Sequence, residues 1–167
     1  FGLCTDTGFF RHLTEDSAHV FAAVSRLTAA GASPNRIHSL IYGNRPLASH
    51  RMLSTLLMRT ETYFGGRLLL TYETVNDPGQ KDGRLRNSDT LYLLLQNTEG
   101  VEAVALLQEE KPDELSVGLR SNTSLDVGEI ARAFKGGGHK KAAGFPFYGS
   151  IDEARTCIID IFSNLLR

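Results

Sequence analysis

Three consecutive glycines followed by a histidine, Gly136 to His139, constrain the fold of this chain more than any other stretch. Glycine takes left-handed backbone conformations without steric cost, so Gly136 is suited to end a preceding helix. The next two glycines let the backbone approach a ligand and turn several N–H groups toward one anion. Ala142-Ala143-Gly144 would let such a loop lie flat against its neighbours. A flexible linker is the alternative, but linkers seldom carry His and Ala-Ala-Gly in this order.

A helix is predicted immediately before the glycines. Asp126 suits the N-cap, Glu129 the acid of a capping box, and Leu125 and Ile130 a hydrophobic staple. Apolar residues then recur at helical spacing up to Phe134. A cap, a staple and a glycine stop therefore mark both ends of this helix.

Length and charge narrow the class of protein. The 167 residues are enough for one ordinary domain, or one with a remnant, and 41% hydrophobic content is normal for a globular protein. With a net charge of −1, no global field attracts nucleic acid, so any anion site is local. Cys4 and Cys157 match no metal or redox spacing, which suits a reducing cytoplasm. No apolar run has a membrane-spanning length and no signal peptide is seen.

The order of predicted elements indicates an α/β fold. Phe1–Thr5 is predicted as the end of a buried strand, which suggests that a preceding part of the chain is missing, and 6–13 as the loop after it. Three helices follow. The first is predicted from Thr14 to Gly31 and would bury Val20, Val24 and Leu27. The second is predicted from Ser33 to Gly43 and would bury Ile37, Leu40 and Ile41. The third is predicted from Asn44 to Phe64 and would bury Leu53, Leu56 and Leu57.

The remainder is predicted as a small mixed sheet with flanking helices. Strands are expected at 68–72, 101–109, 114–120 and 145–148, a helix at 89–96, and a mobile polar loop at 76–87. A final helix begins with the capping box Ser150 and Glu153 and buries Ile151, Ala154, Ile158, Ile161 and Leu165. The predicted domains are 1–43, a linker helix 44–64, and 65–167.

Two charged residues, Asp6 and Arg120, are candidates for binding a cation and a phosphate. Asp6, between two threonines and before Gly8, would follow a strand end and suits a hard divalent cation; an Asp that merely caps a turn is the alternative. In 114–120, apolar residues alternate, so Arg120 projects away from the core at the strand's end, where a guanidinium can bind phosphate. A solvated surface arginine is the alternative there.

His139 is interpreted as a partly exposed donor to phosphate or base, rather than a core histidine bonded to a carbonyl. His12, His19, His38 and His50 show no pairing that suggests a metal site. Phe145, Phe147 and Tyr148 fit either a base-stacking platform or a core strand.

Three motifs carry a resemblance to a known family. GGGHKKAAGF (136–145) resembles the signature GGGHxxAAG of the C-terminal domain of DHH-type phosphoesterases. GLRS (118–121) resembles that domain's S-L-R-S segment, and TDTGFFR (5–11) resembles the fourth motif of the DHH catalytic domain. Together they cover essentially the whole chain. Lys135 replaces the first of the four glycines that are common in the family.

The resemblance implies site residues. Asp6 would be catalytic as one ligand of a two-metal centre, usually manganese. Arg120, Ser121, Gly136, Gly137, Gly138 and His139 would contact the phosphates and terminal nucleotide of the substrate, and Arg11 another phosphate, although a surface arginine is as good an interpretation. No D-H-H or D-x-D occurs in the 167 residues. Since one carboxylate cannot hold a metal pair, the chain alone should be catalytically incomplete without an N-terminal catalytic domain.

The implied function is part of a phosphoesterase of the oligoribonuclease and 3′-phosphoadenosine-5′-phosphate (pAp) phosphatase type. The chain would supply the substrate-binding domain, preceded by a linker helix and a helical remnant of the catalytic domain. It would act on short RNA or a nucleotide in the cytoplasm, away from membranes, alone or as a homodimer. Relatives that hydrolyse cyclic dinucleotides, single-stranded DNA or polyphosphate remain alternatives, as does an RNA-contacting module like that of alanyl-tRNA synthetases.

Overall fold

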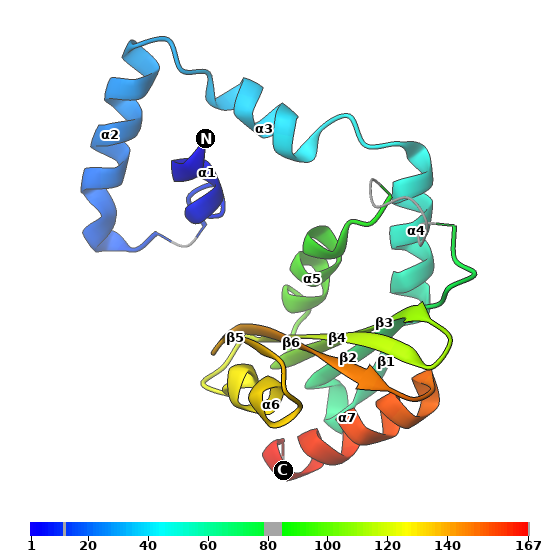
Figure 1. Ribbon diagram of the computed structural model, residues 1–167. Helices are drawn as coiled ribbons and strands as arrows, with labels where there is room; N and C mark the ends of the chain where they lie inside the picture. The colour runs from blue at the N-terminus through cyan, green and yellow to red at the C-terminus, as the bar shows by residue number, and fades with distance from the viewer. Residues whose placement is uncertain (12, 79–84, 167) are drawn as a thin grey trace. The chain divides into compact units, whose positions relative to one another are not determined.

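The computed structural model describes residues 1–11, 13–78 and 85–166. They form two compact units, Phe1–Arg45 and Pro46–Arg167 (Figure 1). In the described part of the chain, none of the helices is both long and apolar enough to cross a membrane.

The first unit is helical: α1 (Gly2–Asp6), η1 (Glu15–Ser17), α2 (Ala18–Ala29) and α3 (Pro34–Tyr42). The prediction of a strand at Phe1–Thr5 is wrong, because the Cys4 N–H donates to the Phe1 carbonyl at 2.9 Å and closes a helical turn. A short apolar run does not by itself distinguish a strand from a helix. The start at Thr14 is confirmed by a reciprocal capping box with Ser17.

The predicted buried faces of α2 and α3 are wrong as well. No described residue of either helix is buried, and Leu27 and Leu40 are among the exposed large hydrophobics. A unit of this size has too little chain to enclose the apolar stripe of each helix.

The second unit is built on one mixed sheet, as predicted. Its strands are β1 (Glu61–Tyr63), β2 (Leu68–Glu73), β3 (Ala103–Lys111), β4 (Glu114–Ser121), β5 (Gly137–His139) and β6 (Ala142–Tyr148). They lie in the order β1-β2-β3-β4-β6-β5. Only the pair β2–β3 among them is parallel. The sheet therefore ends at β5, the strand made by the glycine run.

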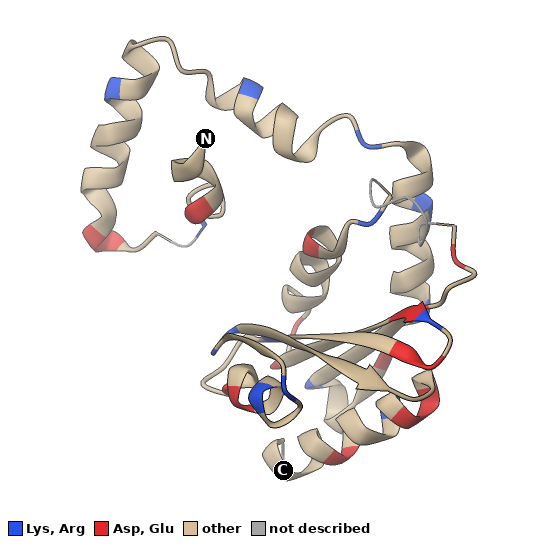
Figure 2. Cartoon of the chain, in the orientation of Figure 1, with Lys and Arg blue, Asp and Glu red and all other residues tan. Residues whose placement is uncertain are grey.

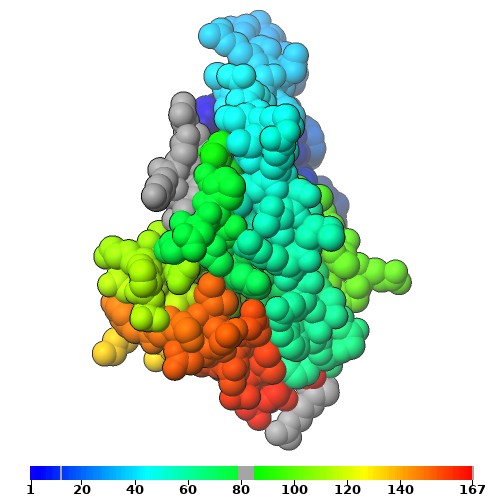
Figure 3. Space-filling model, turned by 90° about the vertical axis from the view of Figure 1, so that its right-hand side faces the viewer, coloured from blue at the N-terminus to red at the C-terminus, as the bar shows by residue number. Residues whose placement is uncertain are grey.

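Helices cover both faces of this sheet (Figure 1). On one face α4 (Leu47–Met58) and α5 (Ser88–Gln96) lie side by side, as Figure 3 also shows, and bury Met52, Leu56, Leu91, Tyr92 and Leu95 against Leu69, Val104 and Leu106. On the other face α6 (Val127–Ala133) and α7 (Ile151–Leu165) pack on the alternate residues of the same strands. The predicted alternation of Leu115, Val117 and Leu119 toward a core is confirmed.

The third predicted helix, Asn44 to Phe64, is too long at both ends. It occupies Leu47–Met58, and Met52 and Leu56 are its buried apolar residues, while Leu53 and Leu57 are partly buried. Gly65 and Gly66 do not end this helix; with φ of 69° and 89° they form the turn η2 (Phe64–Gly66) between β1 and β2. Pairing of β1 with β2 therefore overrides the helical pattern in this segment.

Two further predictions concern loops and the C-terminus. Half of the predicted mobile loop 76–87, residues 79–84, lies outside the described residues, as does His12. The capping box of Ser150 and Glu153 that opens α7 is confirmed. Leu165, however, is exposed, and Phe162 takes the buried place on that face.

Candidate functional site

The centre of the candidate site is Arg120, in the penultimate position of β4. Its guanidinium lies over the ring of Tyr92 on α5, with Cζ 4.0 Å from the ring centroid. This distance is within the range of a favourable cation–π contact. Nη1 also donates to the Leu119 carbonyl at 3.0 Å. Among the described residues no carboxylate pairs with Arg120, so the charge is held in place while most of its N–H donors stay free.

Strand pairing sets the position of His139 relative to Arg120. Arg120 is directly opposite Ala142 on β6, and Ala142 is directly opposite His139 on β5. Residues directly opposite in antiparallel strands project from the same face. Arg120 and His139 therefore both point to the face that carries α5.

Arg120, Ala142 and His139 form a row across the three strands, and the next row on the same face contains only glycine. Gly118, Gly144 and Gly137 are opposite one another on β4, β6 and β5. Without side chains, this row leaves bare backbone on the α5 face, where another group can approach closely. On one side of the glycine row lie Arg120, Ala142 and His139, and on its other side lie Ser116 and Pro146.

The glycine run forms a strand and not the loop that was expected. Gly137, Gly138 and His139 are exposed but pair with β6 as an edge strand, and Ala142-Ala143-Gly144 belongs to β6 itself. The pairing with β6 engages backbone N–H and C=O groups of this strand that would have been free in a loop.

The end of α6 also differs from the prediction. Lys135, and not Gly136, takes the left-handed conformation, with φ of 59°. The Gly136 N–H returns to the Ala131 carbonyl at 2.8 Å, which is the Schellman pattern. At the start of the helix, Asp126 is the N-cap as predicted, and its side chain accepts from the N–H groups of Gly128 and Glu129.

Ser121 is placed away from Arg120. Its side chain is 3% exposed, and its hydroxyl donates to the Thr123 carbonyl at 3.2 Å. One residue beyond Arg120 on the same strand, it projects from the opposite face.

Asp6 and Arg11 belong to the helical unit. Asp6 is exposed at the end of α1, where the Thr5 hydroxyl donates to it at 3.3 Å. The exposed Arg11 donates from Nε to the carbonyl of Gly8 at 2.8 Å. Among the described residues no three His, Cys, Asp or Glu side chains gather as metal ligands.

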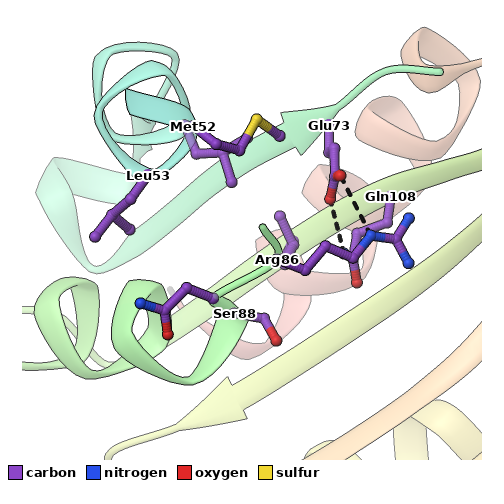
Figure 4. Close-up of a pocket in the computed structure, with 9 residues that line it drawn as sticks. Met52, Leu53, Glu73, Arg86, Ser88 and Gln108 are labelled. Carbon is purple, nitrogen blue, oxygen red and sulfur yellow. Dashed lines mark hydrogen bonds and ion pairs between the residues drawn. The ribbon is translucent and has the colours of Figure 1, made fainter. Parts of the chain in front are cut away.

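Two hollows lie on the α5 face of the sheet. The enclosed one, beside Glu73, has a volume of about 10 Å³, room for one water at most. There Glu73 pairs with Arg86 and accepts from Gln108 at 2.9 Å, as Figure 4 shows. The second, of about 400 Å³, is an open hollow that extends the bare glycine row. It is lined by Gly144, Ser116, Pro146, Tyr148, Glu110 and Glu114, with the core residues Leu115 and Phe145 beneath.

The predicted aromatic platform is divided between the two faces. Phe145 is in the core and Phe147 packs against it, whereas Tyr148 is 78% exposed and shares the α5 face with its partner Glu114.

Basic residues lie in the turn after the glycine strand, whereas acidic residues predominate around the turn between β3 and β4, where Lys111 pairs with Glu114 (Figure 2). Lys140 and Lys141 lie in the turn after His139, near the end of β4 that carries Arg120. Glu109, Glu110, Asp113 and Glu114 surround the turn between β3 and β4 at the other end. An anion is therefore favoured at the end with Arg120 and His139.

No separate signal in the sequence marked Tyr92, Gly118 or Gly144 as site residues. Tyr92 is an aromatic residue in the apolar stripe of α5, which is normally read as core packing. Its role, like that of the glycine row, depends on strand register.

The fold and this edge define a small α/β domain with a six-stranded mixed sheet and a glycine–histidine strand at its rim. The DHHA1 domain family matches residues 70–164, and the chain belongs to this family, as its motifs predicted.

Similar proteins match nearly the whole chain. Protein MG371 of Mycoplasma genitalium is 26% identical over 144 residues, which are 86% of this chain and 43% of that protein. The chain thus spans less than half the length of this relative. The structure of an exopolyphosphatase-related protein from Bacteroides fragilis has a TM-score of 0.82 at 23% identity, covering 98% of this chain and 49% of its own. The structure of PggH from Vibrio cholerae, a pGpG-specific phosphodiesterase, has a TM-score of 0.54 at 13% identity. The match covers 90% of this chain and 51% of PggH.

Proposed function

We propose that this chain binds the phosphate of a short nucleotide substrate on the α5 face of its sheet, as the substrate-binding part of a phosphoesterase. The observation that carries the proposal is Arg120, a guanidinium held by the Tyr92 ring and the Leu119 carbonyl and free of any carboxylate among the described residues. A guanidinium in this state offers N–H donors that match phosphate oxygens. His139, on the same face and in the same row, adds a second donor.

The bare glycine row suggests where the rest of the substrate lies. A nucleobase is flat, and Gly144 and Gly137 leave a flat strip of backbone beside Arg120 and His139. The open hollow continues this strip toward Ser116 and Pro146. We therefore assign the phosphate to the arginine end and the base to the glycine strip, with short oligoribonucleotides or pAp as substrates. The likeness to the pGpG-specific phosphodiesterase concerns the fold, so the choice of substrate rests on Arg120 and its row.

The catalytic part of the proposal concerns the helical unit. Asp6 would be one ligand of a manganese centre, and Arg11 a further phosphate contact. Asp6 belongs to no group of three acidic, histidine or cysteine side chains among the described residues, so the remaining ligands would have to come from other residues. The residues of this chain would bind and orient the phosphate.

The proposal is tested by titrating the chain with adenosine 5′-monophosphate (AMP) while following backbone amide shifts. Binding of about millimolar affinity should move the amides of Arg120, Ala142 and Gly136 to His139 first. Arg120→Ala should weaken binding by about 1.5–3 kcal/mol, the typical value of a hydrogen bond to a charged group. Arg132→Ala is the matched control, since it removes an exposed arginine from α6, on the other face of the sheet.

Adenosine without its phosphate should bind more weakly than AMP and be insensitive to Arg120→Ala. Equal losses of AMP affinity in Arg120→Ala and Arg132→Ala would show that general charge attraction, and not this site, binds the nucleotide. Shifts confined to another surface would also reject the proposal.

A further inference from the structure

We infer that Tyr92 is a positioning residue for the substrate phosphate: it holds the guanidinium of Arg120 in place, and Gly118 lacks a side chain so that Tyr92 can lie there. This inference rests on the proposed function, since it assigns to Arg120 a phosphate ligand. Tyr92 itself touches no substrate in this account and acts through Arg120.

The first support is the burial of Tyr92. Its side chain is packed between α4, α5 and the sheet, in the cluster that includes Leu91, Leu95 and Leu106, and the residue is only 5% exposed. A ring enclosed in this way has a defined position. The Arg120 guanidinium, 4.0 Å from the ring centroid, rests on a fixed surface and not on a mobile side chain.

The second support is the contact between Tyr92 and the bare backbone of β4. A Cβ built on Gly118 would lie 2.1 Å from the Tyr92 hydroxyl oxygen and 3.3 Å from Cζ of the ring. The phenol therefore lies directly on the strand at Gly118, and the same ring meets Arg120 two residues further along. Any side chain at Gly118 would force the ring to move.

The third support is the set of donors that remain free. A guanidinium has five N–H groups, and one of those on Arg120 is used by the Leu119 carbonyl. The contact with the ring uses the face of the guanidinium and no N–H group. Fixing a long side chain before the ligand arrives lowers the entropy lost on binding. Tyr92 thus orders Arg120 while leaving its donors for a phosphate.

A double-mutant cycle on AMP binding by the full chain tests this inference. Tyr92→Leu should weaken AMP binding about 3- to 10-fold, the typical cost of immobilising one long side chain on binding. Tyr92→Phe keeps the ring and should stay within about twofold of the parent. In the Arg120→Ala background, Tyr92→Leu should have no further effect, because the residue that it positions is gone.

The cycle separates the two claims. Equal losses from Tyr92→Leu in the presence and absence of Arg120 would mean that Tyr92 acts only in packing, and would overturn the inference while leaving the proposed function intact. An Arg120→Ala variant that binds AMP as the parent does would reject the proposed phosphate site itself.

A second test keeps the aromatic ring. Gly118→Ala should weaken AMP binding because its methyl group collides with the Tyr92 hydroxyl. Adding Tyr92→Phe removes that oxygen and leaves the closest contact at 3.3 Å, so the double variant should recover most of the affinity. A double variant that is folded by its amide spectrum but binds as weakly as Gly118→Ala would overturn the inference.

Discussion

Arg120 and His139 stand in one row across the sheet, with Ala142 between them as the direct partner of both. Two strand spacings of about 4.8 Å separate them, so their Cα atoms are roughly 10 Å apart. Their side chains leave the sheet on the same side, and the glycine row lies next to them. One cation and one imidazole, from two segments of the chain, therefore lie on the same face of the sheet.

His139→Ala should weaken AMP binding by about 0.5–1.5 kcal/mol, the net value of one hydrogen bond, and leave thermal stability unchanged because the residue is exposed. Amide titration and thermal unfolding measure the two effects. Arg132→Ala is the control, since this exposed residue lies on α6, on the other face of the sheet. Equal effects of the two variants would contradict the assignment of His139.

Gly136→Ala should destabilise the fold, whereas Gly137→Ala should be tolerated. A Cβ on Gly136 would meet the Gly144 carbonyl oxygen at 2.2 Å and the Phe145 Cβ at 2.4 Å, while one on Gly137 meets no atom within 4 Å. We expect a loss of about 1–3 kcal/mol for Gly136→Ala, as for other overpacked sites, and less than 1 kcal/mol for Gly137→Ala. Urea unfolding measures both; similar losses would show that glycine flexibility, and not crowding, matters in this run.

Tyr92 should be the last tyrosine to ionise. Burial raises the pKa of its phenol to about 12, although the charge of Arg120 acts in the opposite direction. The folded protein holds this proton more tightly than the unfolded chain, whose tyrosines titrate near pH 10, so stability falls as the pH rises from about 10 to 12.

Absorbance at alkaline pH should therefore show one phenol titrating late, and Tyr92→Phe should abolish that step. In Arg120→Ala the step should shift to still higher pH, because the favourable charge is removed. A late step that survives in Tyr92→Phe would belong to another tyrosine and refute the assignment.

Asp77→Asn should destabilise the second unit at neutral pH. Asp77 accepts from Nη2 of Arg59 at 2.9 Å and from the Thr74 N–H at 2.7 Å. Burial alone would raise the pKa of Asp77, but these hydrogen bonds outweigh burial and lower it. We expect a loss of about 1.5–3 kcal/mol in urea unfolding, as for hydrogen bonds to a charged group.

The pH dependence of that loss follows from the lowered pKa. The stabilisation by Asp77 is fully present above the unfolded value of about 3.9 and disappears as the pH falls through the lower, folded value. The parent and Asp77→Asn should therefore differ at pH 7 and converge in acid, below the folded pKa of Asp77. Asp160→Asn, at an exposed position of α7, serves as the control that should change little. A difference that persists unchanged in acid would assign the effect to packing.

The elements of the second unit were largely predictable because their signals are local. Alternating apolar residues marked β4, and capping residues marked the starts of α6 and α7. Errors occurred where non-local pairing decided the outcome. Glu61–Tyr63 was predicted as part of a helix but forms a strand paired with β2. The glycine run was predicted as a loop but forms a strand paired with β6.

By itself, the sequence determined the α/β class, the caps of the helices and the motifs shared with the DHHA1 family, because each depends on residues that are close together in the chain. Only the tertiary structure decided that Arg120 and His139 share a face, that three glycines from three strands align beside them, and that Tyr92 lies on Gly118 beneath the guanidinium. The physical reason is register: strand pairing joins segments far apart in the chain, and a shift of one residue would turn each side chain to the opposite face.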